Sequence, residues 1–395
     1  MASPDHKRVL ISAPLYANGG IEAHLFNLCR LLVEHGAEVT LVSRYARRRI
    51  RLVQQHRQIP IRLYTTPFAE SGGPASTLWA TLAWPLHLLP RFDVLHTLDV
   101  SPFVNFLALF LKPGGYLIGG RAGIVPAVPG FVEPRVQRKL DGFLVEADAL
   151  AEKYQLDIPI SVIPHLGNVR CAAERQRRKV DELQVLFLGR LHADKGIFRL
   201  LEIWPRLNIQ PARLHFHGDG PERASLEQAI RERNLLSRVT VHGAAAPEEL
   251  PAIFDRADLL VLPSAGEGLP LVLMESMAYG VPFVATDVGA IRTLAQDNPD
   301  VSVVPLSDAA LQFGIERMAR AIRSGQIDGR RLQQYHRERY GYDLVASRWL
   351  QALLHPEEFW KGGGSEEEIG RNAVPATSRN RRRPRLVAEQ DRGSV

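Results

Sequence analysis

Cysteine is scarce in this chain of 395 residues, which contains Cys29 and Cys171 and no others. The two fall in different predicted domains, so the sequence excludes a disulfide framework and fits a reducing cytoplasm. No cluster of histidine and cysteine residues indicates a zinc site. No hydrophobic run with the form of a signal peptide follows the first residues, so we expect the protein to stay in the cytoplasm.

Long hydrophobic runs are also lacking. The apolar stretches Leu78–Leu89 and Val100–Leu111 are shorter than the ~20 apolar residues needed to cross a bilayer. Trp79 and Trp84, with an arginine cluster nearby in sequence, allow a helix that lies on an anionic membrane surface. The alternative is that both stretches are core helices. We therefore expect a cytoplasmic protein and keep open a peripheral position on the inner face of the cytoplasmic membrane.

The charge is unevenly distributed, with a net charge of +6 and basic residues in two clusters. Such clusters suit anionic partners such as lipid headgroups or phosphates, and the alternative is a solvated face or tail. No nucleic-acid partner is expected. Residues 361–395 are rich in Gly, Glu and Arg with few apolar side chains, which predicts disorder. The clusters comprise Arg44, Arg47, Arg48, Arg49, Arg51 and Arg57, and Arg379, Arg381, Arg382, Arg383 and Arg385.

The segment 258–286 predicts a strand, a glycine-rich loop, a helix and a second strand. Pro270 suits the first turn of a helix, and Gly280 suits a helix end that needs a left-handed residue. In an open parallel sheet, the loop after such a strand is where ligands bind. The segment is therefore the first candidate for a binding site.

Two glutamates mark this segment, Glu267 in the loop and Glu275 eight positions later in the helix. The free N–H groups of a first helical turn favour a phosphate, and a carboxylate one turn deeper can accept bonds from a pair of sugar hydroxyls. The alternative is a solvated glutamate beside a simple turn. The whole phrase resembles the Glu-x7-Glu signature of the retaining glycosyltransferases of family four (glycosyl transferases group 1). The resemblance extends roughly from Lys7 to Leu353.

The resemblance implies the GT-B architecture, in which two Rossmann-like, doubly wound α/β domains face each other across a cleft. It implies an acceptor-side domain over residues 1–166 and a linker over 167–182. A nucleotide-sugar-binding domain would follow over 183–340. A C-terminal helix over 341–360 would cross back to the first domain.

The first half begins with the pattern strand, Gly19-Gly20 loop, helix and strand. The loop resembles the family's first glycine-rich motif, which approaches the donor phosphate and the acceptor. Where the family commonly has a histidine that contacts the donor sugar, this chain reads Gly-Gly-Arg-Ala-Gly over 119–123. His96 and Arg121 are the candidates for that role, and each has a structural residue as its alternative.

The second half places Arg190 and Lys195 five apart on a loop that opens a helix. Both can point at one diphosphate, and fixed cations there would stabilise a departing diphosphate more than the bound substrate. By resemblance, Gly218 and Gly220 lie beside the nucleotide and Gly243 lines the base pocket. Further candidates for binding the donor sugar and phosphate follow Glu267, namely Gly268, Leu269 and Leu271.

The sequence has no Asp-x-Asp pair, which the other common glycosyltransferase architecture uses to hold a divalent metal. We therefore expect no metal and no cofactor. The function implied is retaining transfer of a sugar from a nucleotide-diphosphate sugar to a glycan or lipid-linked acceptor, in bacterial surface polysaccharide, lipopolysaccharide or glycolipid synthesis. The alternatives are a sugar-nucleotide epimerase, for which His96 and Asp99 lie on the first wall, and a non-catalytic nucleotide-binding partner subunit. The sugar, the base and the acceptor stay open.

Overall fold

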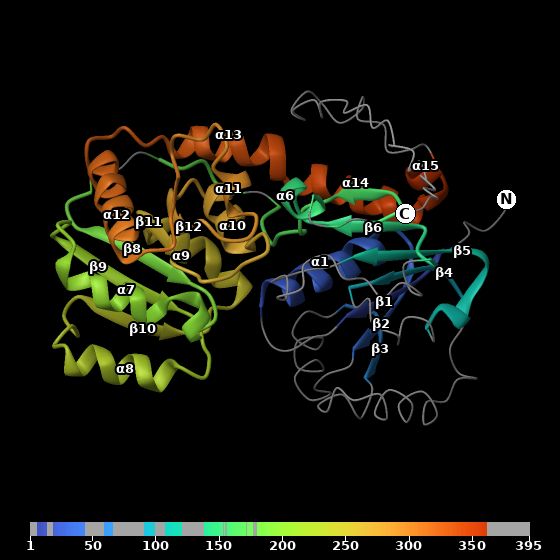
Figure 1. The fold of residues 1–395 in the computed structure, drawn as a ribbon, viewed down its shortest axis with the longest axis horizontal. Coiled ribbons are helices and arrows are strands. Elements are labelled where there is room, and N and C mark those ends of the chain that lie inside the picture. The colour runs from blue at the N-terminus through green and yellow to red at the C-terminus, as the bar shows by residue number, and fades with distance from the viewer. Residues whose placement is uncertain are drawn as a thin grey trace, which may run out of the picture.

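The computed structural model contains two parallel sheets, one in each half of the chain (Figure 1). It describes residues 6–13, 19–43, 59–65, 91–98, 107–120, 138–152, 154, 156–170, 172–176 and 180–361. Several predictions fall outside these residues. They concern Trp79 and Trp84, the stretch 78–89, the arginine clusters, Asp99, Arg121 and the tail.

The first sheet has seven strands in the order β3-β2-β1-β4-β5-β6-β7, and all pairings are parallel. Its strands are β1 (Arg8–Ala13), β2 (Glu38–Ser43), β3 (Arg62–Thr65), β4 (Phe92–Thr97), β5 (Leu111–Gly120), β6 (Gly142–Val145) and β7 (Ile160–Val162). The described helices of this half are α1 (Gly20–Glu34), η2 (Ala108–Phe110) and α6 (Asp148–Ala151). Leu111 begins a strand, so the predicted helix over Val100–Leu111 is wrong at that end.

The second sheet has six parallel strands in the order β10-β9-β8-β11-β12-β13. Its strands are β8 (Leu183–Leu188), β9 (Ala212–His217), β10 (Val239–Gly243), β11 (Leu259–Leu262), β12 (Phe283–Thr286) and β13 (Ser302–Val304). Its helices are η3 (Ala193–Lys195), α7 (Ile197–Ile203), η4 (Trp204–Arg206), α8 (Arg223–Glu232), η5 (Pro247–Glu249), α9 (Leu250–Arg256), α10 (Leu271–Ala278), α11 (Ile291–Leu294), α12 (Asp308–Arg323) and α13 (Gly329–Tyr340).

The strand order of each sheet reverses next to its first strand, between β1 and β4 and between β8 and β11. Strands near this point are buried on both faces, so they are continuous apolar runs rather than alternating ones. All four residues of β11 and of β12 are buried. The predicted fold class of two Rossmann-like α/β domains is confirmed, and the reversal point is where such sheets bind ligands.

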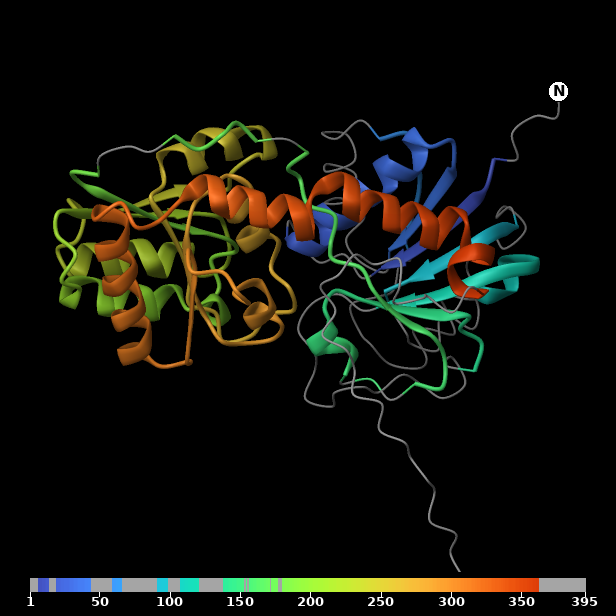
Figure 2. The same ribbon diagram turned by 90° about the horizontal axis from the view of Figure 1, so that it is seen from above.

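Two helices at the end of the described chain join the domains (Figure 2). α13 packs on α10 of the second domain, and α14 (Tyr342–Leu354) packs on α1 of the first. Trp349 of α14 is buried and donates its Nε1–H to the carbonyl of Pro164 at 2.9 Å. In α15 (Pro356–Lys361), the ring of Trp360 occupies the space above Gly142 where a side chain would otherwise lie. The two-domain arrangement is therefore held by apolar packing of α14 and α15 on the first sheet.

Candidate functional site

The loops after β8, β11 and β12 meet at the carboxyl edge of the second sheet. Gly196 has a φ of +70°, and a methyl group there would lie 2.0 Å from the carbonyl oxygen of Pro263. Gly289 has a φ of +62°, and a methyl group there would lie 2.0 Å from the carbonyl oxygen of Glu267. Both positions therefore require glycine, since only glycine adopts these angles easily and leaves room for the neighbouring backbone. The loops of the site therefore pack so closely that their backbones are in direct contact.

Lys195 and Glu267 form the central polar contact of these loops. Lys195 Nζ donates to Glu267 Oε1 at 2.7 Å, and the two side chains are 18% and 9% exposed. The hydroxyl of Ser264 donates to the same carboxylate oxygen at 2.6 Å. The predicted residues Lys195 and Glu267 are thus brought together, at a distance typical of a charge-assisted hydrogen bond.

Arg190 lies on the same loop as Lys195 but has a different partner. Its Nη2 is 3.4 Å from Asp194 Oδ2, and the side chain is 42% exposed. Asp194 also lies 2.6 Å from Nδ1 of His192. The guanidinium is therefore at the surface of the loop, held by one weak ion pair that a stronger anion could replace.

Glu275 is on α10, one helix turn below the loop that holds Glu267. Its side chain is buried, and Oε1 accepts a hydrogen bond from Nδ2 of Asn168 at 2.7 Å. Asn168 lies in the segment that connects the two domains. Glu275 is therefore near the domain boundary. It does not join the contact between Lys195 and Glu267 but has a partner of its own, Asn168.

The N-terminus of α10 faces the glycine loop of the first domain. A methyl group added at Gly20 would lie 3.7 Å from Leu271, and one at Gly167 would lie 3.9 Å from the same side chain. Pro270 precedes α10, and no side chain caps the helix. The predicted residues Gly20 and Leu271 thus meet across the boundary between the domains. Gly19 directly precedes Gly20, and its carbonyl accepts from Ala23 N at 3.0 Å.

Three further predicted glycines line a neighbouring part of the sheet edge. Gly218 N donates to the carbonyl of Gly243 at 2.6 Å. A methyl group on Gly220 would lie 2.2 Å from the carbonyl oxygen of Leu191, so this turn contacts the loop of Arg190. Gly268 contacts the loop after β12, because its carbonyl accepts a hydrogen bond from Ala290 N at 3.0 Å, and Leu269 is buried.

His96 does not lie at an accessible surface. Its side chain is 0% exposed in β4, and Nδ1 donates to the carbonyl of Ile118 at 3.2 Å. Burial lowers the pKa of His96 to about 4, so the ring is neutral at physiological pH. These observations contradict the prediction that His96 contacts the donor sugar. A strand flanked by apolar residues on a sheet covered on both faces explains the burial.

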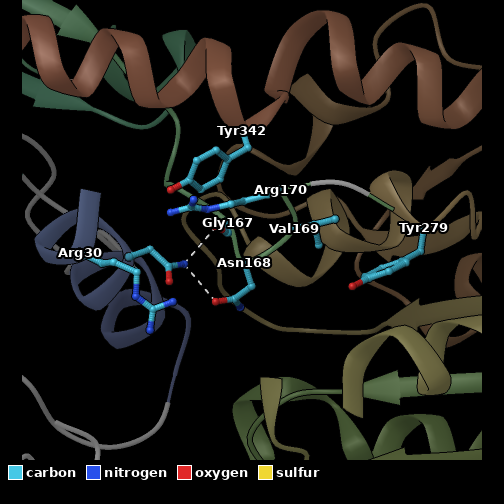
Figure 3. Close-up of a pocket in the computed structure, with 8 residues that line it drawn as sticks. Arg30, Gly167, Asn168, Val169, Arg170, Tyr279 and Tyr342 are labelled. Carbon is cyan, nitrogen blue, oxygen red and sulfur yellow. Dashed lines mark hydrogen bonds between the residues drawn. The ribbon is translucent and has the colours of Figure 1, made fainter. Parts of the chain in front are cut away.

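A cavity of about 390 Å³ opens at the junction of the domains, away from the Lys195–Glu267 pair (Figure 3). Arg30 reaches it from α1, and Tyr342 lies beside the guanidinium of Arg170. Its lining also includes Asn27, Gly167, Asn168, Val169 and Tyr279. Arg170 is bonded to Glu34 at 2.7 Å, which raises the pKa of Arg170.

Sequence reasoning missed Ser264 and Asn168 as members of the site. Ser264 lies three residues before Glu267, within the predicted loop, and a hydroxyl at that spacing was a usable signal. Asn168 is 107 residues from its partner Glu275, so no local pattern could have shown the contact.

Two other features of the described residues bear on cofactors and membranes. Within them, no group of three or more His, Cys, Asp or Glu side chains is arranged to hold a metal ion. Within the same residues, no helix combines the length and apolar character needed to pass through a bilayer.

In comparisons with known proteins, the family match lies in the second domain of this chain. Residues 182–321 match the family described as glycosyl transferases group 1. The putative teichuronic acid biosynthesis glycosyltransferase TuaC of Bacillus subtilis (strain 168) is 30% identical over 250 residues, 62% of this chain. The aligned part is 58% of TuaC, so the chain spans somewhat more than half the length of that relative.

Solved structures share the fold over nearly the whole chain. Sucrose-phosphate synthase from Thermosynechococcus elongatus superposes with a TM-score of 0.69 at 18% identity, covering 90% of this chain and 99% of that protein. Anabaena HepE in complex with UDP and glucose superposes with a TM-score of 0.67 at 16% identity, covering 88% and 99%. At these identities the likeness concerns the fold alone.

Proposed function

Residues 182–321 match the glycosyl transferases group 1 family and the chain has the GT-B fold, and from these findings we propose that the chain is a retaining glycosyltransferase. It would move a hexose from a nucleotide-diphosphate sugar to a glycan or lipid-linked acceptor. The nucleotide would bind to the second domain, and the acceptor would bind to the first domain across the boundary marked by Gly20 and Leu271.

The single observation that carries this proposal is the contact of Lys195 with Glu267 beside the start of α10. Both side chains are largely buried, and their loops are held together by glycines in backbone contact. Burial of an ion pair at a rigid loop costs free energy through desolvation, so it is a poor choice for stability alone. A cation held next to the N-terminus of a helix is well suited to a diphosphate.

Several of the predicted residues have a role in this proposal. Glu275 would accept hydrogen bonds from the donor ribose hydroxyls. Glu267, with the amides of Gly268 and Leu269, would bind the donor sugar and the phosphate. Leu271 would border the donor at the first turn of α10.

Arg190 and Lys195 would stabilise the leaving nucleoside diphosphate as the glycosidic bond breaks. The ion pair of Arg190 with Asp194 is long and half exposed, so a diphosphate could take over the guanidinium at little cost. Charge that develops on the leaving group would then face two fixed cations. This arrangement would take the place of a divalent metal, and we propose catalysis without metal or cofactor on that ground.

Retention would follow from attack on the face that the diphosphate leaves. The acceptor oxygen would bond to the anomeric carbon as the bond to the phosphate oxygen breaks. The departing phosphate oxygen would take the acceptor's proton. No side chain is needed as a nucleophile in this path, and His96 is too deeply buried to act as one.

The setting we propose is bacterial surface polysaccharide, lipopolysaccharide or glycolipid synthesis. TuaC is described as a glycosyltransferase of teichuronic acid biosynthesis, and HepE has been solved with UDP and glucose. These relatives support a nucleotide-sugar donor and a glycan acceptor. A position at the cytoplasmic face of a membrane stays part of the proposal.

The test is release of nucleoside diphosphate by the purified protein from UDP-, GDP- and ADP-sugars, with glycan or polyprenyl-linked acceptors. Activity with at least one donor, and its loss in Lys195→Ala and Glu275→Ala, is expected. No release from any donor, or unchanged rates in both variants, would refute the proposal. Interconversion of a labelled sugar nucleotide without acceptor would indicate the epimerase instead. Nucleotide binding without turnover would indicate the non-catalytic subunit.

A further inference from the structure

Two asparagines form a hydrogen-bonded chain that ends on Glu275. Asn27 Nδ2 donates to Asn168 Oδ1 at 3.0 Å, and Asn168 Nδ2 donates to Glu275 Oε1 at 2.7 Å. Figure 3 shows Asn168 at one end of a dashed line that marks its hydrogen bond with Asn27. The chain crosses from the first domain through the connecting segment into the second.

The direction of these hydrogen bonds is fixed by their chemistry. A carboxylate only accepts, so the NH2 group of Asn168 must face Glu275 and its oxygen must face Asn27. The NH2 group of Asn27 also donates to the carbonyls of Leu166 and Gly167, at 3.2 Å and 3.0 Å. Rotating the amide of Asn168 by 180° would therefore place like groups together at both of its hydrogen bonds.

The carboxylate of Glu275 has more acceptor positions than this hydrogen-bonded chain uses. A carboxylate has about four acceptor positions on two oxygens, and Asn168 uses one of them on Oε1. The bond with Asn168 thus restrains the orientation of the carboxylate plane. A buried carboxylate held by a charge-assisted bond needs no reorganisation when a hydroxyl pair arrives.

We propose that Asn168 is a positioning residue for the nucleotide donor and that Asn27 is the residue that orients it. Asn168 holds the carboxylate of Glu275 ready for the ribose, and Asn27 ties that arrangement to α1. Because the three side chains come from both domains and the segment between them, donor binding depends on how the domains are placed. This inference rests on the proposed role of Glu275 in binding the donor ribose.

The decisive variant is Asn168→Asp, which keeps the shape but replaces the donating NH2 group with a second carboxylate. Loss of a charge-assisted hydrogen bond is expected to weaken binding of UDP, GDP or ADP about tenfold to a hundredfold at pH 7.5. As the pH falls, the two carboxyl groups share one proton and the hydrogen bond returns. The ratio of variant to wild-type dissociation constants, measured by calorimetry from pH 8 to pH 5, should therefore decrease towards one.

Two more variants separate positioning from folding. The double variant Asn168→Asp/Glu275→Gln exchanges the amide and the carboxylate, so it should regain the melting temperature while nucleotide affinity stays low. Asn168→Ala adds no charge, so it should bind more weakly than wild type by a factor that does not change with pH. Asn234→Asp, at an exposed turn of the second domain, is the matched control and should leave affinity unchanged.

The outcomes distinguish this inference from the proposed function. If the wild type binds UDP, GDP or ADP and Asn168→Asp binds equally well with the same pH profile, the positioning role is wrong and the function stands. If the wild type binds none of the three nucleotides, the proposed function fails and the inference falls with it. Should Asn168→Asp not fold, equal affinity of Asn168→Ala and wild type would overturn the positioning role.

Discussion

Replacing Lys195 with methionine removes the ammonium group that lies 2.7 Å from Glu267 Oε1 and keeps most of the side-chain volume. The carboxylate of Glu267 is 9% exposed, so water cannot replace the lost cation. The hydroxyl of Ser264 would still donate a hydrogen bond to the Glu267 carboxylate. The variant therefore tests both the stability of the loop and the electrostatics of the proposed reaction.

The magnitude can be worked from this contact. Two unit charges 2.7 Å apart attract by about 6 kcal/mol at an effective dielectric constant of about 20. Desolvation offsets much of that attraction, and removing one partner of a buried pair costs roughly 3–5 kcal/mol. Because Lys195 is 18% exposed, we expect the lower end, about 3 kcal/mol. Loss of a fixed cation at the leaving group should reduce kcat by roughly 10²–10³.

The assay compares Lys195→Met, Glu267→Gln and the double variant. Urea denaturation gives stability, and nucleoside diphosphate release gives kcat. The double variant replaces both charges, so it should recover most of the lost stability, since no unpaired charge stays buried. It should not recover kcat, because the cation facing the diphosphate is still missing.

Two results would refute this reasoning. A Lys195→Met protein with kcat within about threefold of wild type would show that the ammonium does not face the reaction. A double variant that regains both stability and kcat would show that Lys195 acts only by neutralising Glu267.

Three further predictions concern pH, backbone and metal. The pKa of His96 is lowered to about 4 in the fold and is near 6.5 when unfolded, so the unfolded chain binds a proton first. The contribution of His96 to the free energy of unfolding is therefore complete above pH 6.5 and falls by about 1.4 kcal/mol per pH unit towards pH 4. The variant His96→Asn should remove this part of the pH dependence when stability is measured by urea denaturation. Gly289→Ala should cost roughly 1–3 kcal/mol and weaken nucleotide binding, whereas Gly325→Ala, with a similar φ of +70° and open space around it, should leave binding unchanged. EDTA should not change the rate of nucleotide release, and abolition of activity would disprove metal independence.

Local features of the fold were predictable at positions where the backbone conformation favours one residue type, such as glycine or proline. Gly280 has the left-handed φ of +67° that its position after a helix indicates, and Pro270 directly precedes α10. The C-terminal helix expected over 341–360 is present as two helices, α14 (Tyr342–Leu354) and α15 (Pro356–Lys361). Short apolar strands between glycine-rich loops likewise identify the parallel sheets.

Contacts between distant segments left no such signal. The partner of Glu275 is Asn168, and a hydrogen bond between residues 107 positions apart depends on how the domains are placed. The burial of His96 could also not be predicted from the sequence, because a polar residue near the end of a strand occurs both at exposed edges and in covered sheets. The prediction for His96 was therefore wrong because its burial depends on the rest of the fold.

The central claim is that the loop of Lys195 and Glu267, together with α10, receives a departing nucleoside diphosphate. The most direct measurement is the rate at which that product appears from a panel of sugar nucleotides, for wild type, Lys195→Met and Glu275→Ala side by side. The account predicts turnover by the wild type with at least one donor and a rate at least a hundredfold lower in each variant. Equal rates in all three proteins would contradict it.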